Sequence, residues 1–129
     1  MEQAGHQWIA GQRRARRGAP DDVLDPATGK IVASGRLATV EDVDDAVAAA
    51  RSAQPGWGSL PPAERSAAMH RLAFELDAAA DELARTESSQ TGKPIRLSTE
   101  FDVPGTIDNT SFFAGAARLL SASASGEYS

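Results

Sequence analysis

The sequence predicts a mostly helical fold in which short strands come first and three helices follow. Two observations lead to this prediction. Apolar residues alternate within the first 38 residues, as in half-buried strands, but recur at three- and four-residue spacing over most of the remainder. Glycines and prolines separate these patterns at the places where strands and helices are expected to end.

The first 38 residues are expected to form short strands joined by turns. "QWIAGQ" is a plausible strand with Gly11 at its turn, and the arginine-rich "RRARR" follows it. In "DVLDPATGKIV", Pro26 favours an extended Asp25, and Gly29 suits a left-handed turn position because it has no Cβ atom. Apolar side chains at alternating positions then predict a further strand: Ile31, Ala33 and Leu37.

The first helix is predicted to begin at Thr39. In "TVED", Thr39 suits the N-cap position and is followed three residues later by Asp42. The helix is expected to end near "QPGWG", which places Trp57 in the connection. The apolar side chains at helical spacing are Val43, Ala46, Val47 and Ala50.

The second and strongest helical pattern begins at "LPPAER" and continues to "SSQTG". Pro61 or Pro62 suits the first turn, where the missing N–H costs nothing. Gly92 is expected to end the helix in a left-handed conformation, and Pro94 prevents its continuation. One apolar stripe runs along the whole helix: Met69, Leu72, Ala73, Leu76, Ala80 and Leu83.

A third helical pattern covers the remainder up to a small, polar tail at 121–129, which has no reason to become ordered by itself. Pro104 interrupts the front of this pattern, so the helix either starts there with Asp102 as its cap or is kinked there. The predicted apolar face consists of Ile107, Thr110, Phe113, Ala114, Ala117 and Leu120.

Composition excludes several functional classes. The 129 residues carry a net charge of -5, which argues against a general nucleic-acid binder. Without cysteine there can be no disulfide, thiolate metal site or cysteine nucleophile. The sequence shows no secretory signal. It also contains no apolar run as long as the about 20 residues that span a membrane, so we expect a cytoplasmic protein.

The alanine-rich helix faces bury little apolar area, so we expect low stability for the chain alone.

The pairs Gly29-Lys30 and Gly92-Lys93 raise the question of a phosphate-binding loop. The glycine that such a loop needs five residues earlier is absent at both places, and neither lysine is followed by Ser or Thr. Both pairs are therefore interpreted as turns.

The arginine run is interpreted as a solvated strand edge. His6 and His70 lack a second metal ligand, and His70 is expected to be partly buried.

The order of these motifs resembles the amino-terminal region of the aldehyde dehydrogenase superfamily. The motifs are "DPATGK", "EDVDDAVAAA", a tryptophan, "PPAER" and "TGKP", and the resemblance extends from about Trp8 to Tyr128. The stretch "STEFDVPGTIDNTSFFAGAARLL" is most similar to enzymes of aminoaldehydes, such as gamma-aminobutyraldehyde and betaine aldehyde dehydrogenases.

The resemblance implies an α/β fold of which residues 1–129 form only the leading strands and first three helices of the NAD(P)-binding domain. It also implies an aldehyde substrate and homo-oligomers for the intact enzyme, whose oligomerisation hairpin is expected beyond this chain. The family's catalytic cysteine, glutamate and asparagine and its cofactor-binding motifs are likewise expected downstream. We therefore predict an inactive fragment that binds no NAD(P), nucleic acid or membrane.

The resemblance also implies a monovalent cation site, with the backbone carbonyl of Leu24 and Asp102 at the matching positions. Asp102 as a simple helix cap is the alternative interpretation, and the two stay open at this point. A non-enzymatic helical interaction module, derived from the same family, is the alternative for the function of the whole chain.

Overall fold

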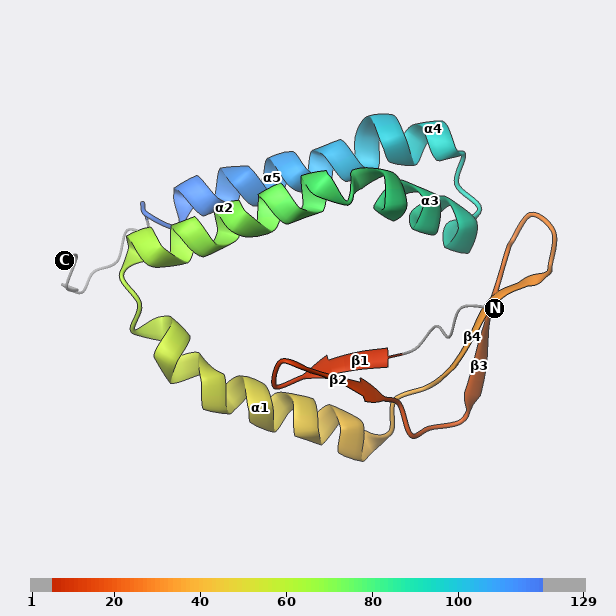
Figure 1. Cartoon of the computed structure of the whole chain (residues 1–129), viewed down its shortest axis with the longest axis horizontal. Coiled ribbons are helices and arrows are strands. Elements are labelled where there is room, and N and C mark those ends of the chain that lie inside the picture. Colours follow the sequence, from red (N-terminus) through yellow and green to blue (C-terminus); the bar gives the residue numbers. More distant parts are fainter. Residues whose placement is uncertain (1–5, 120–129) are drawn as a thin grey trace. The chain divides into compact units, whose positions relative to one another are not determined.

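The structure, a computed structural model, describes residues 6–119 of the chain as four short strands followed by helices (Figure 1). The chain divides into two compact units. The first contains the described residues up to Gly56 together with Ser89–Gly92, and the second contains the described residues of the remainder. The prediction for the tail at 121–129 concerns residues outside the described part.

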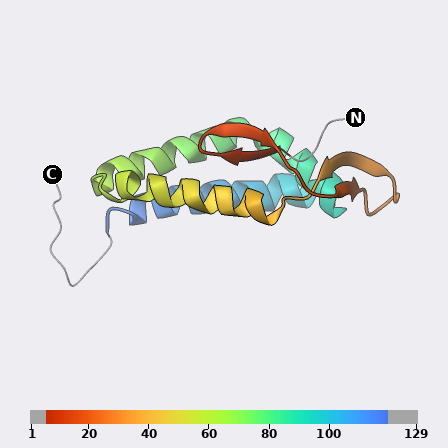
Figure 2. The same ribbon diagram turned by 90° about the horizontal axis from the view of Figure 1, so that it is seen from below.

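The strands of the first unit form two separate antiparallel hairpins, β1–β2 and β3–β4. Gly29 has a φ angle of 68°, which confirms its predicted left-handed conformation, and Gly11, predicted at a turn, has a φ of 71°. Figures 1 and 2 show the first hairpin running alongside helix α1. The bounds are β1 (His6–Ile9), β2 (Gln12–Ala15), β3 (Pro20–Leu24) and β4 (Ile31–Arg36).

Side chains of the turn between β3 and β4 stabilise it. The Asp25 carboxylate accepts hydrogen bonds from the Thr28 hydroxyl and the Ala27 N–H, each at 2.8 Å. These bonds, with that of Thr28 the strongest, favour the ionised form and lower the pKa of Asp25 below its ordinary value. The turn predicted at "DPATGK" is confirmed, and the bonds of the Asp25 side chain make it an Asx-type turn closed by a glycine.

Helix α1 (Val40–Gly58) begins with the predicted cap. The Asp42 N–H donates to Thr39 Oγ1 at 3.2 Å, and the Thr39 N–H donates to Asp42 Oδ2 at 3.0 Å. This reciprocal pair satisfies two N–H groups that have no partner within the helix. Trp57, which was expected in the connection, lies inside the helix, since α1 continues past Pro55.

The second unit contains a break that the sequence does not predict. The expected single helix consists of α2 (Pro62–Ala78) and α3 (Ala80–Thr91), separated at Ala79 with φ of -100° and ψ of 9°. The predicted end is confirmed, because Gly92 has a φ of 73°.

A short helix α4 (Ile95–Leu97) and a π-helical turn η1 (Ser98–Asp102) lead into α5 (Val103–Ala116). Asp102 has helical backbone angles and makes no capping hydrogen bond, so its interpretation as the cap of a helix starting at Pro104 is wrong. The backbone is already helical from Ile95 onward, and Pro104 is the second residue of α5, directly after the π-helical turn η1.

Small side chains form the contact between α2 and α5, which run side by side in opposite directions (Figures 1 and 2). Ala73 and Ala114 are buried on the predicted faces, and Val103 is buried with them. Leu72 and Phe113, which were predicted on the same faces, are 52% and 57% exposed. Alanine allows close approach of two helices, so the larger side chains beside it remain at the edge of the contact.

No helix among residues 6–119 is long and apolar enough to cross a membrane.

Candidate functional site

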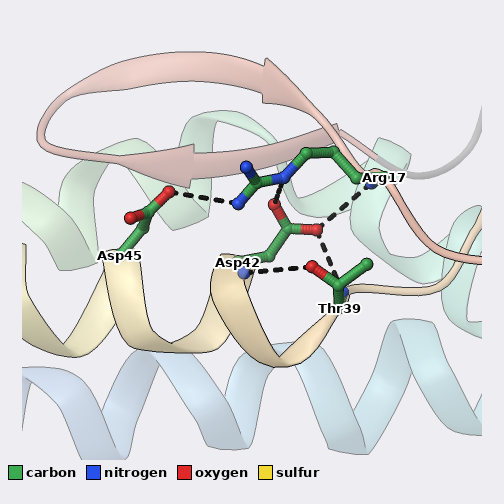
Figure 3. A network of polar contacts seen from close by, with 4 residues as sticks. All are labelled: Arg17, Thr39, Asp42 and Asp45. Atoms are coloured by element: carbon green, nitrogen blue, oxygen red, sulfur yellow. Dashed lines mark hydrogen bonds and ion pairs between the residues drawn. The ribbon is translucent and has the colours of Figure 1, made fainter.

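A polar cluster of the first unit surrounds the buried carboxylate of Asp42, at the start of α1 (Figure 3). Arg17, which follows β2, donates its backbone N–H to Asp42 Oδ2 at 3.1 Å and its Nε–H to Asp42 Oδ1 at 2.6 Å. Its Nη2 group reaches Asp45 Oδ2 at 3.2 Å. Together with the bond from Thr39, these contacts connect the end of the first hairpin to the first turn of α1.

The cluster strongly favours the ionised form of Asp42. The Thr39 N–H, then the backbone and guanidinium groups of Arg17, and the Gln7 side chain hold the pKa of Asp42 far below its ordinary value despite burial. In return, the hydrogen bond to Asp42 raises the pKa of Arg17. This buried, multiply bonded carboxylate acts as a structural clamp between the first hairpin and α1. Sequence reasoning found Thr39 and Asp42 but not their arginine partner.

The predicted surface character of the arginine run is confirmed at Arg13 and Arg14, whereas Arg16 is half-buried. All of β2 is exposed, and Arg13 contacts His6 Nδ1 at 3.0 Å across the hairpin. His70 is exposed on α2, so its predicted partial burial is wrong.

The second unit carries a cluster of a different kind around Lys93, at the connection from α3 to α4. Its Nζ lies 2.5 Å from Asp102 Oδ2 and 3.3 Å from Glu87 Oε1. The side chains of Lys93 and Asp102 are 34% and 41% exposed, so water screens the pair in part. The hydrogen bond to Asp102 raises the pKa of Lys93, and the bond to Glu87 adds to it.

The two residues predicted to hold a monovalent cation belong to different units. Leu24 ends β3 in the first unit, and Asp102 ends η1 in the second. Asp102 offers oxygen atoms of the type that alkali ions prefer, but its carboxylate already forms an ion pair with the ammonium group of Lys93. Within residues 6–119, no group of three acidic, histidine or cysteine side chains is arranged to hold a metal ion. The cation site remains a prediction.

A groove of about 340 Å³ lies in the second unit, where η1 and α5 meet the junction of α2 and α3. Val103, Pro104 and Ile107 form an apolar wall, whereas Asp77, Asp81 and Asp108 place three carboxylates around it. This negative charge disfavours the phosphate groups of a dinucleotide. The described residues contain no glycine-rich loop between a parallel strand and a helix, which is the usual place for the phosphates of a dinucleotide.

Ser98, the first residue of η1, has a fully buried side chain whose hydroxyl has no hydrogen-bond partner among the described residues. A buried hydroxyl without a partner costs about 1–3 kcal/mol. We therefore expect Ser98→Ala to leave the free energy of unfolding unchanged or to raise it by about 1 kcal/mol. Urea unfolding followed by circular dichroism measures this change, with the exposed Thr99→Ala variant as the control. A clear loss of stability would show that the hydroxyl has a stabilising partner.

Comparison with known proteins identifies the family. The model of the aldehyde dehydrogenase family matches residues 13–127. A 2-aminomuconic semialdehyde dehydrogenase from Bos taurus is 41% identical over 95 residues, which is 74% of this chain and 20% of that protein. A betaine aldehyde dehydrogenase from Mesorhizobium japonicum is 42% identical over 100 residues, 78% of this chain and 20% of that protein.

The fold agrees with these sequence relationships. The solved structure of PnpE in complex with nicotinamide adenine dinucleotide superposes with a TM-score of 0.86 at 37% identity. The superposition covers 92% of this chain and 24% of PnpE. The chain therefore spans only about a fifth to a quarter of the length of these relatives. It matches the predicted amino-terminal region, and it belongs to the aldehyde dehydrogenase family.

Proposed function

We propose that residues 1–129 are the amino-terminal part of the NAD(P)-binding domain of a cytoplasmic aldehyde dehydrogenase that oxidises an aminoaldehyde to a carboxylic acid. The family match over residues 13–127 supports the reaction class. Two relatives named for nitrogen-containing aldehydes, 2-aminomuconic semialdehyde and betaine aldehyde, support the substrate class. The nitrogen substituent distinguishes these substrates from simple aliphatic aldehydes.

In this proposal the chain contributes structure and no reacting group. Family members form a covalent intermediate with a cysteine thiolate, and this sequence contains no cysteine. The Asp42 clamp fixes the first hairpin on α1, and the close contact of α2 with α5 forms the second unit. Both are parts of a framework on which the rest of the enzyme would build its cofactor and substrate sites.

The first test measures the activity of the 129-residue chain. Purified protein mixed with NAD and gamma-aminobutyraldehyde or betaine aldehyde is expected to produce no reduced cofactor, measured by its absorbance. The Mesorhizobium japonicum betaine aldehyde dehydrogenase serves as the positive control. Turnover by the 129-residue chain would overturn the proposal.

A chimera tests the structural role directly. We expect that this chain can replace the matching region of the Mesorhizobium japonicum enzyme, to which it is 42% identical, with NAD-dependent activity retained. The matched control is the same chimera with Asp42→Ala. This change removes the Asp42 clamp but alters no residue that reacts with the substrate or the cofactor. A soluble, folded chimera without any activity would contradict the proposed equivalence.

A non-enzymatic interaction module is the second candidate, and one observation favours it. Four phenylalanines of the second unit are more than half exposed: Phe74, Phe101, Phe112 and Phe113. Exposed aromatic side chains are common at protein interfaces. A stable dimer that melts cooperatively in size-exclusion and circular dichroism experiments would favour the module. A partly unfolded or aggregating chain would favour a portion of a larger enzyme.

A further inference from the structure

The position of Lys93 is fixed by the backbone on both sides. Gly92 precedes it with a φ of 73° at the end of α3, and Pro94 follows it as the N-cap of α4. The Lys93 carbonyl accepts a hydrogen bond from Ser88 Oγ at 2.7 Å. The ammonium group therefore starts from a restrained backbone, which reduces the entropy lost when it pairs with a carboxylate.

Two carboxylates converge on this ammonium group. Asp102 Oδ2 lies 2.5 Å from Nζ, and Glu87 Oε1 lies 3.3 Å from it. Glu87 belongs to α3 and Asp102 to η1, so the cluster joins two elements within the second unit. One positive charge between two negative charges is also the arrangement that a bound Na⁺ or K⁺ would produce.

We propose that the Lys93 ammonium group takes the place of an alkali cation at the Asp102 carboxylate. Both are monovalent cations that favour anionic oxygen, and a metal ion at Asp102 Oδ2 would compete with Nζ for the same oxygen and would be repelled by its charge. The described residues supply no third acidic or histidine side chain to compensate for that displacement. The junction of α3 and η1 is thus held by a cation that belongs to the chain itself.

The consequence is a stability that does not depend on alkali ions. Thermal unfolding of the 129-residue chain is measured by circular dichroism in sodium, potassium and choline chloride at one ionic strength. The wild type is expected to melt at the same temperature in all three salts, whereas Lys93→Met lowers the midpoint by a few degrees. Lys93→Arg keeps the positive charge and should restore most of the loss.

Lys30→Met is the matched control, since Lys30 is the only other lysine and lies in the exposed turn before β4. This variant should melt close to the wild type. Equal losses for Lys93→Met and Lys30→Met, or a wild type that is more stable in sodium or potassium chloride than in choline chloride, would overturn the proposal.

A second measurement, made on the wild type, tests the proposal even if Lys93→Met fails to fold. Protein with ¹³C-labelled lysine gives two side-chain signals, which the Lys30→Met variant assigns. Exchange of choline for potassium at constant ionic strength should leave both signals in place. A shift confined to the Lys93 signal would show that potassium competes for Asp102, and the proposal would be wrong.

Discussion

Asp42→Ala is expected to lower the thermal midpoint of the chain by several degrees, clearly more than Thr39→Ala does. Removing the Thr39 hydroxyl costs one capping bond, typically about 1 kcal/mol. Removing the Asp42 carboxylate leaves the Thr39 N–H and two donors of Arg17 without their acceptor. Donors left without an acceptor lower the stability of the fold when water cannot reach them, and the Asp42 side chain is only 3% exposed.

Asp45→Ala is the matched control for this comparison. Asp45 also pairs with Arg17, at 3.2 Å, but its side chain is 50% exposed. Exposed pairs contribute little because water screens them, so this variant should melt within about a degree of the wild type. Equal effects of Asp42→Ala and Asp45→Ala would contradict the view that the buried carboxylate is the centre of the clamp.

The same clamp predicts a dependence of stability on pH. The folded-state pKa of Asp42 lies well below its ordinary value of 3.8, so its contribution is fully present above that value. As the pH falls below 3.8 towards the lower pKa of the folded state, protonation of Asp42 removes the contribution. Asp42→Asn lacks this titration. The difference in midpoint between wild type and Asp42→Asn should therefore shrink as the pH is lowered from neutrality through that range, and a constant difference would contradict the assignment.

Features that depend on neighbouring residues were predictable from the sequence. Thr39 and Asp42 lie three residues apart, and their reciprocal bonds need only the first turn of a helix. Gly29 and Gly92 adopt the expected left-handed conformation because few other residues tolerate it. The order of such local motifs along the chain was also sufficient to indicate the family.

Features that depend on distant residues were not predictable. Arg17 finds Asp42 only because the first hairpin runs alongside α1, and nothing in "RRARR" distinguishes this arginine from its neighbours. The helix break falls at Ala79 within three alanines, the residue type with the highest helix propensity, so the local sequence holds no signal for it. The pair of Lys93 and Asp102 likewise requires that the chain turn at Gly92 and Pro94 and then continue through η1.

Gly92→Ala is expected to cost about 2–4 kcal/mol of unfolding free energy, because two penalties add. The first is conformational: a residue with a Cβ atom at a φ of 73° loses about 1–2 kcal/mol. The second is steric, since the new Cβ would lie 3.1 Å from Pro26 Cβ and 3.3 Å from its Cγ. The stiff proline ring, in the turn after β3, has little freedom to move away from it.

Gly29→Ala separates the two penalties. Gly29 has a nearly identical φ of 68°, but a Cβ placed on it meets nothing within 4 Å. This variant should therefore show the conformational cost alone, and the difference between the two alanine variants, measured by urea unfolding, gives the cost of the contact with Pro26. In a Pro26→Gly background the contact is absent, so Gly92→Ala should cost no more than Gly29→Ala. If the two alanine variants already cost the same in the wild-type background, the end of α3 does not press on the "DPATGK" turn. If they differ as expected, the end of α3 packs against the "DPATGK" turn within the first unit, and this contact favours glycine at position 92 in addition to its φ angle.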